Sequence, residues 1–162
     1  MNFKDILYSV TCLAFTIVIG AAVYEHLAVV PQWSAAPPKS LSMFQGEYGL
    51  KAVKFWGPIH PVAIVLFIAS MIVSWRTPRK IYILISMIGY LLVIIITFSH
   101  FVPELLAITM TPFSGEVNVD LTQRSQQWEI LSLVRLLFLM ILSIILFLGL
   151  TKGASLTNKA SS

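Results

Sequence analysis

The sequence contains few charged residues and only one cysteine. Charged side chains make up 11% of its 162 residues and hydrophobic ones 57%, whereas soluble proteins average about 25% charged residues. A soluble chain of this length could not bury so much apolar surface, so the composition excludes a soluble nucleotide-binding enzyme and a nucleic-acid binder. Cys12 has no second thiol for an intrachain disulfide, a redox pair or a cysteine metal cluster.

The net charge of +4 reflects the distribution of basic residues around the apolar stretches. Lys4, the basic residues in 76–80, Lys152 and Lys159 all lie on one side of these stretches, where Asp5 is the one acidic residue. Short loops rich in lysine and arginine stay in the cytoplasm. The pattern therefore predicts a multi-pass protein of the inner (cell) membrane, embedded in the lipid bilayer, with both termini in the cytoplasm.

Four apolar stretches, at residues 6–30, 55–75, 81–101 and 128–150, are each long enough to cross about 30 Å of hydrocarbon as a helix. A tight hairpin at residues 76–79 makes the second and third helices antiparallel neighbours. The sequence thus predicts an all-α bundle of four transmembrane helices. The bundle is expected to form a single domain over residues 1–150, followed by a flexible cytoplasmic tail over residues 151–162.

Two long outer connections, residues 31–54 and 102–127, are expected to pack over the bundle as an extracytoplasmic lid. Residues that precede proline avoid helical dihedrals, so the second helix is expected to begin at Pro58 or Pro61, and Pro103 to break or end the third helix. A short amphipathic helix on the membrane face is predicted from the spacing of Leu41, Phe44, Tyr48, Lys51 and Phe55.

Ionisable side chains in membrane spans are costly and usually face the bundle interior. Three histidines lie near the outer ends of three different spans, and glutamates on the first, third and fourth spans lie at a similar level. We therefore expect one site near the outer face, in which the histidines are catalytic or bind a metal. The predicted metal ligands are His26, His60, His100, Glu25, Glu104 and Glu129.

Helical phase supports an inward polar face on the third and fourth spans. Arg135 lies two turns inside the fourth span, on a stripe with Trp128 and Ser132. An arginine at that depth needs a carboxylate or carbonyl partner, and Glu25 is the first expected counter-ion, with Glu104 the second. The expected inward face of the third span consists of Ser86, Tyr90, Thr97, His100 and Glu104.

Aromatic side chains near the same level are candidates for binding a substrate. The predicted substrate-binding residues are Trp33, Trp56, Tyr90 and Trp128. Tryptophans at these depths also fit the aromatic belt of a membrane protein, and single interfacial histidines are most often hydrogen-bonded anchors. Glu104 and Glu129, taken singly, also fit solvated helix ends.

Several short motifs resemble those of the anthrone-oxygenase-like family of small four-helix membrane proteins. They are Tyr24-Glu25-His26, Val30-Pro31-Gln32-Trp33, Phe55-Trp56 with Ile59-His60-Pro61, residues 97–104 (TFSHFVPE), and Trp128 with Arg135. The resemblance implies a four-helix bundle and, for some fungal members, oxygenation of an anthrone without an evident organic cofactor. Many bacterial members have no assigned activity, and this sequence is more similar to those. The positions that the resemblance carries over are His26, His60, His100, Glu104, Trp128 and Arg135.

Three functions remain open. The first is an oxygenase-like oxidoreductase, with Arg135 among its catalytic residues, that acts on a small lipophilic phenol or quinol from the bilayer. The second is a metal- or haem-binding protein without turnover, and the third is a small carrier or accessory subunit, which the absence of repeat symmetry disfavours. One divalent transition metal (iron, copper or zinc) is the expected cofactor, with haem second to it. Without metal, the histidines could abstract a phenolic proton. Enzymatic turnover and oligomeric state stay open.

Overall fold

The computed structural model describes residues 2–153. In this range four helices are long and apolar enough to cross a membrane: Phe3–Ser34, Val53–Ser74, Lys80–Thr109 and Val119–Thr151. Large apolar side chains cover their outward faces, among them Leu13, Ile17, Val65, Ile72, Ile85, Leu92, Ile95, Leu133, Leu137 and Ile144. Such a surface needs lipid rather than water around it, which indicates a multi-pass membrane protein. The predicted flexible tail falls mostly on residues 154–162, outside the described residues.

Two of the four spans are interrupted by a π-helical turn without losing continuity. The first consists of α1 (Phe3–Tyr24), the π turn η1 (Glu25–Val29) and α2 (Val30–Ser34), and a 3-10 helix, η2 (Lys39–Phe44), follows it. The second is α3 (Val53–Ser74). The third consists of α4 (Lys80–Ile96), the π turn η3 (Thr97–Phe101) and α5 (Val102–Thr109). The fourth is α6 (Val119–Leu148), which ends in the 3-10 turn η4 (Gly149–Thr151).

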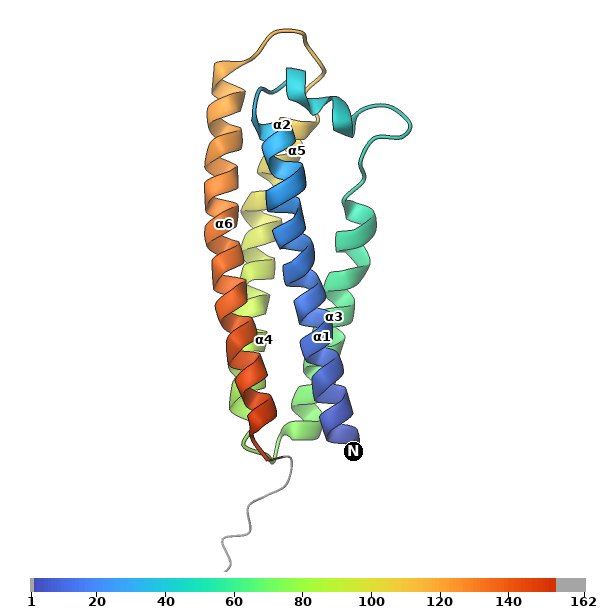
Figure 1. The fold of residues 1–162 in the computed structure, drawn as a ribbon, viewed down its shortest axis with the longest axis vertical. Coiled ribbons are helices and arrows are strands. Elements are labelled where there is room, and N and C mark those ends of the chain that lie inside the picture. Colours follow the sequence, from blue (N-terminus) through green and yellow to red (C-terminus); the bar gives the residue numbers. More distant parts are fainter. Residues whose placement is uncertain (1, 154–162) are drawn as a thin grey trace, which may run out of the picture.

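The spans run up, down, up and down around a common axis (Figure 1). Helix α1 packs on α3 and α6, and α4 packs on α3 and α6, so the four spans form a closed square. The N-terminus, the α3–α4 hairpin and the end of α6 lie at one end of the bundle (Figure 1). We call the opposite end, which carries both long connections, the outer end. The predicted all-α arrangement of four long apolar helices is confirmed.

Away from the outer end, the core of the bundle consists of aromatic rings packed edge-on and of polar groups that are hydrogen-bonded to one another. Phe15 is fully buried, with its ring edge-on to Phe67 at 5.3 Å and to Tyr90 at 5.0 Å. The hydroxyls of Thr11 and Ser70 lie 2.6 Å apart and join α1 to α3. Because hydrocarbon offers no hydrogen bonds, polar side chains in a span are stable only with partners of this kind.

Gly89 lets α4 approach α6 closely. A Cβ atom at this position would lie 2.6 Å from the side chain of Leu142, and small residues at such interfaces permit close helix packing. We expect Gly89→Val to lower the free energy of unfolding by about 1–3 kcal/mol, measured by denaturation of the detergent-solubilised protein. Gly20→Val is the matched control, because a Cβ there meets nothing within 4 Å. Equal losses in the two variants would show that helix propensity, not packing, sets the effect.

Prolines do not end helices where the sequence predicted. Helix α3 begins at Val53, so the predicted start at Pro58 or Pro61 is wrong, and both prolines lie inside the helix. They deprive the carbonyls of Lys54 and Gly57 of their usual i+4 donors. The predicted break at Pro103 is also wrong, because η3 joins α4 to α5. A proline ring clashes with the carbonyl four residues earlier, and the wider π turn makes room for it.

The two long connections meet at the outer end. The backbone N–H of Asn118 donates to the carbonyl of Pro37 at 2.9 Å, and Gln45 donates to the carbonyl of Thr111 at 3.5 Å. The predicted amphipathic helix from Leu41 to Phe55 is wrong. The helical part, η2, ends at Phe44, and the chain then turns at Gly46, whose φ of 76° favours glycine.

Candidate functional site

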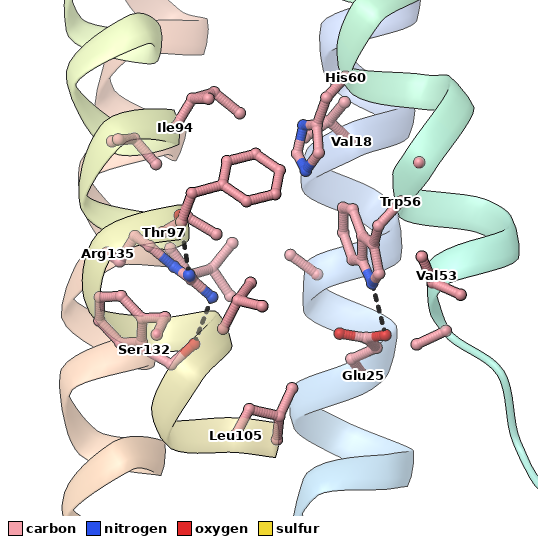
Figure 2. Close-up of a pocket in the computed structure, with 18 of the residues that line it drawn as sticks. Val18, Glu25, Val53, Trp56, His60, Ile94, Thr97, Leu105, Ser132 and Arg135 are labelled. Carbon is pink, nitrogen blue, oxygen red and sulfur yellow. Dashed lines mark hydrogen bonds between the residues drawn. The ribbon is translucent and has the colours of Figure 1, made fainter. Parts of the chain in front are cut away.

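A cavity of about 550 Å³ lies between the outer halves of the four spans. Much of its wall is apolar and includes Val18, Ile94 and Leu105 (Figure 2). Ligand sites in proteins typically have volumes of about 300–1,000 Å³, with a few polar groups in an apolar wall. The polar residues that line this cavity from the four spans include Glu25, His26, Trp56, His60, Tyr90, Thr97, Ser132 and Arg135.

Arg135 enters the cavity from α6, and its hydrogen-bond partners are neutral side chains. Its Nη1 donates to the hydroxyl of Thr97 at 3.0 Å and its Nη2 to the hydroxyl of Ser132 at 2.7 Å (Figure 2). The guanidinium carbon lies 4.1 Å from the centre of the Phe101 ring. Within residues 2–153, no carboxylate oxygen lies within 4.0 Å of the Arg135 nitrogens. The site therefore holds a cation supported by neutral groups.

The predicted counter-ions of Arg135 are engaged elsewhere, so both predicted ion pairs are wrong. Glu25 accepts a hydrogen bond of 2.8 Å from the indole N–H of Trp56. Figure 2 shows the Glu25 carboxylate and the Arg135 guanidinium on opposite walls of the cavity. Glu104 instead forms two hydrogen bonds with Arg124, at 2.8 and 3.1 Å, an arrangement that matches the geometry of both groups.

His60 lies in the cavity wall between two aromatic side chains. Its Nδ1 is 2.7 Å from the hydroxyl of Tyr90, and its ring stacks on Trp56 with 5.3 Å between the centres. Tyr90 is buried and is held by the rings of Phe15 and Phe67. The aromatic core thus fixes Tyr90, and Tyr90 in turn orients the imidazole of His60.

His26 presents a different kind of imidazole. Only 8% of its surface is exposed, and its Nδ1 lies 2.8 Å from the carbonyl of Ala22. A carbonyl can only accept, so Nδ1 carries the proton and Nε2 is an acceptor. Nε2 is buried and has no hydrogen-bond partner in the described part of the chain. The ring is nearly parallel to that of Trp128, with 6.4 Å between the centres. In this tautomer, Nε2 of His26 is therefore a buried acceptor without a partner among residues 2–153.

The structure does not bring His100 into the cavity. His100 is exposed and packs against the edge of Phe101. The physical reason is η3, because a π turn contains one more residue than an α turn and shifts the helical phase of the residues after it. Phe101 takes the inward position instead: it lines the cavity, and its carbonyl accepts from the indole N–H of Trp128 at 2.9 Å. Sequence reasoning missed Phe101; the Val102-Pro103 pair after it was the available signal.

Two other predicted site residues also lie away from the cavity lining. Glu129 accepts a hydrogen bond from the hydroxyl of Ser34 at 2.8 Å. Trp33 is buried in an apolar cluster at the outer end, where its ring packs edge-on against Trp128. Trp128 belongs to this cluster and also lines the cavity, so it connects the outer cluster to the site.

The donor set does not fit the expected three-histidine metal site. Across residues 2–153, no three histidine, cysteine or carboxylate side chains are grouped so that they could hold a metal ion. His100 is turned away, and Glu104 and Glu129 are bound to other side chains.

The cavity has the volume and the mostly apolar lining that are typical of small-molecule sites, and it lies among four helices that are apolar enough to cross a membrane. Comparisons of the chain with protein-family models, curated proteins and solved structures found no match.

Proposed function

We propose that the protein binds a small lipophilic phenol- or quinol-type molecule from the bilayer and oxidises it in an oxygenase-like reaction. The observation that carries the proposal is Arg135, a cation that has no carboxylate partner among residues 2–153 and lines a mostly apolar cavity. Such a cation stabilises a phenolate far better than it would in water, because the surroundings do not screen the charge. The motif resemblance to the anthrone-oxygenase-like family also favours this reaction class.

The proposed reaction begins with transfer of the phenolic proton to an imidazole. His26 is the preferred base, because it lines the cavity and its bond to Ala22 leaves Nε2 as an acceptor; the side chains that bury Nε2 must move for a phenol to reach it. His60 is the alternative. Arg135 then holds the phenolate oxygen. O2 adds to the ring carbon para to that oxygen, forming a C–O bond. Loss of that carbon's proton and cleavage of the O–O bond release water. The phenol loses four electrons to O2, so phenol plus O2 gives para-quinone plus water.

We also propose that the outer connections form the lid and that both termini lie in the cytoplasm. Contact between the two connections, at Asn118 and Pro37, supports a continuous cover over the site. The α3–α4 hairpin supports the orientation, because it brings Arg76, Arg79 and Lys80 to the end of the bundle where the chain begins. A closed cover would exclude water and protect the phenolate from protonation.

The proposed chemistry can be tested with 1-naphthol in lipid nanodiscs. We expect one O2 to be consumed for each 1,4-naphthoquinone formed, measured with an oxygen electrode and by absorbance. His26→Gln should lower turnover at least about 100-fold, because it removes a general base. His100→Gln is the matched control and should retain turnover, because His100 lies outside the cavity.

Three outcomes would contradict parts of the proposal. Equal losses in His26→Gln and His100→Gln would remove His26 as the base. Binding of 1-naphthol without O2 consumption would leave a binding protein rather than an enzyme. Absence of both binding and turnover would overturn the phenol site itself.

A further inference from the structure

The guanidinium of Arg135 has donor capacity that the protein does not use. Arginine carries five N–H donors in a plane, and the two hydrogen bonds to Thr97 and Ser132 use one on each terminal nitrogen. The ring of Phe101 lies over one face of this plane, 4.1 Å from its central carbon. A ligand therefore finds its polar contact at the edge of the guanidinium, where the remaining N–H groups point, rather than at that face.

The carboxylate of Glu25 provides the opposite kind of contact. An ionised carboxylate only accepts hydrogen bonds, and its two oxygens offer several lone pairs. Trp56 donates to Oε1, and among the described residues no donor bonds to Oε2. In Figure 2 this carboxylate lies across the cavity from Arg135. The two walls thus offer an acceptor on one side and donors on the other.

We infer that the cavity selects molecules with oxygen functions at two opposite ends, an inference that rests on the proposed function. The oxygen that becomes the phenolate binds Arg135, and a hydroxyl at the far end donates to Glu25. A neutral molecule that satisfies both walls gives each of these two groups a hydrogen-bond partner without adding charge to the cavity. A molecule with one polar group forms a hydrogen bond with one wall only. The charged group on the other wall then loses water without gaining a hydrogen-bond partner, which costs binding free energy. Glu25 is then a specificity-determining residue.

The test compares three naphthalene probes without O2, so that binding is measured without turnover. 2,6-Dihydroxynaphthalene carries its hydroxyls at opposite ends, 2,3-dihydroxynaphthalene carries them side by side, and 2-naphthol has one. Calorimetric titration into protein-loaded nanodiscs, with empty nanodiscs as the blank, gives each affinity. We expect the 2,6 isomer to bind at least about 10-fold more tightly than either of the others, the gain typical of a hydrogen bond to a charged group.

Two variants connect this preference to the residue that causes it. Glu25→Gln should reduce the preference for the 2,6 isomer to about 3-fold or less, because a neutral acceptor bonds about half as strongly. 2-Naphthol should bind this variant at least as tightly as the parent, because the neutral amide removes the charge that a probe with one hydroxyl leaves without a partner. Glu129→Gln is the matched control and should keep the full preference, because Glu129 bonds to Ser34 outside the cavity.

The possible failures are distinguishable. Equal affinity for all three probes would overturn the two-anchor inference and leave the proposed phenol site intact. A preference that survives in Glu25→Gln would assign the second anchor to another residue and would also overturn the inference. Lack of binding by every probe, 2-naphthol included, would overturn the proposed function itself.

Discussion

Replacing Arg135 with methionine is expected to lower turnover of 1-naphthol about 100- to 1,000-fold while leaving the folded protein as stable as the parent, or more stable. Arg135 is partly buried in the cavity wall, yet its partners among the described residues are two hydroxyls and an aromatic ring. Replacing buried ionic groups by apolar side chains of similar volume is often neutral or stabilising by about 1–4 kcal/mol. The hydroxyls left behind, on Thr97 and Ser132, can turn to carbonyls of their own helices.

Turnover is expected to fall although stability does not, because the phenolate would lose its counter-charge. Removing a charge-stabilising donor of this kind typically costs about 100- to 1,000-fold in rate. Two measurements are made on the same nanodisc preparation. Intrinsic fluorescence reports thermal unfolding, and an oxygen electrode reports O2 consumption. Arg124→Met is the matched control: it breaks the pair with Glu104 outside the cavity and should retain turnover. A large loss of stability in Arg135→Met would show that the guanidinium has a structural counter-ion.

The sequence allowed the spans, their order and many of the cavity residues to be predicted. Apolar stretches of about 20 residues have one stable solution in lipid, because every backbone group must be paired within the helix. Costly polar residues inside such stretches turn toward the bundle interior. Glu25, His60 and Arg135, from three spans, accordingly line one cavity. These placements depend on local periodicity and on burial, both of which are readable from a single chain.

The placement of His100 and the pairing of Glu104 could not be predicted in the same way. Phase arguments assume about 100° per residue along an α-helix, and η3 breaks that assumption by adding a residue between Thr97 and Phe101. The same pattern occurs in the first span, where η1 is followed by Val30-Pro31. Ion pairing depends on distances between spans, which spacing along one helix does not fix. The carboxylate of Glu104, which was predicted as the second counter-ion of Arg135, therefore pairs with Arg124 instead.

Deleting Ser99 is expected to destabilise the protein and abolish turnover, although its side chain does little. Ser99 is exposed, and its hydroxyl donates to the carbonyl of Ile96 in its own span. The deletion removes the extra residue of η3, so the helix after it rotates by about 100°. Phe101 then leaves the cavity, and the buried indole N–H of Trp128 loses its acceptor. That loss alone costs about 1–3 kcal/mol.

The controls separate register from composition. Ser99→Ala keeps the register and should change the free energy of unfolding by no more than about 0.5 kcal/mol. Deletion of Gly115, in the outer connection, shortens the chain equally without touching a helix, and a Cβ there would meet nothing within 4 Å. It should retain most of the stability and turnover. If the protein lacking Ser99 unfolded at the parental Tm and still oxidised 1-naphthol, the extra residue would not set the inward face. Ser99→Ala controls for the side chain and the Gly115 deletion for chain length. A loss confined to the Ser99 deletion therefore assigns the alignment of Phe101, Trp128 and Arg135 to the π turn.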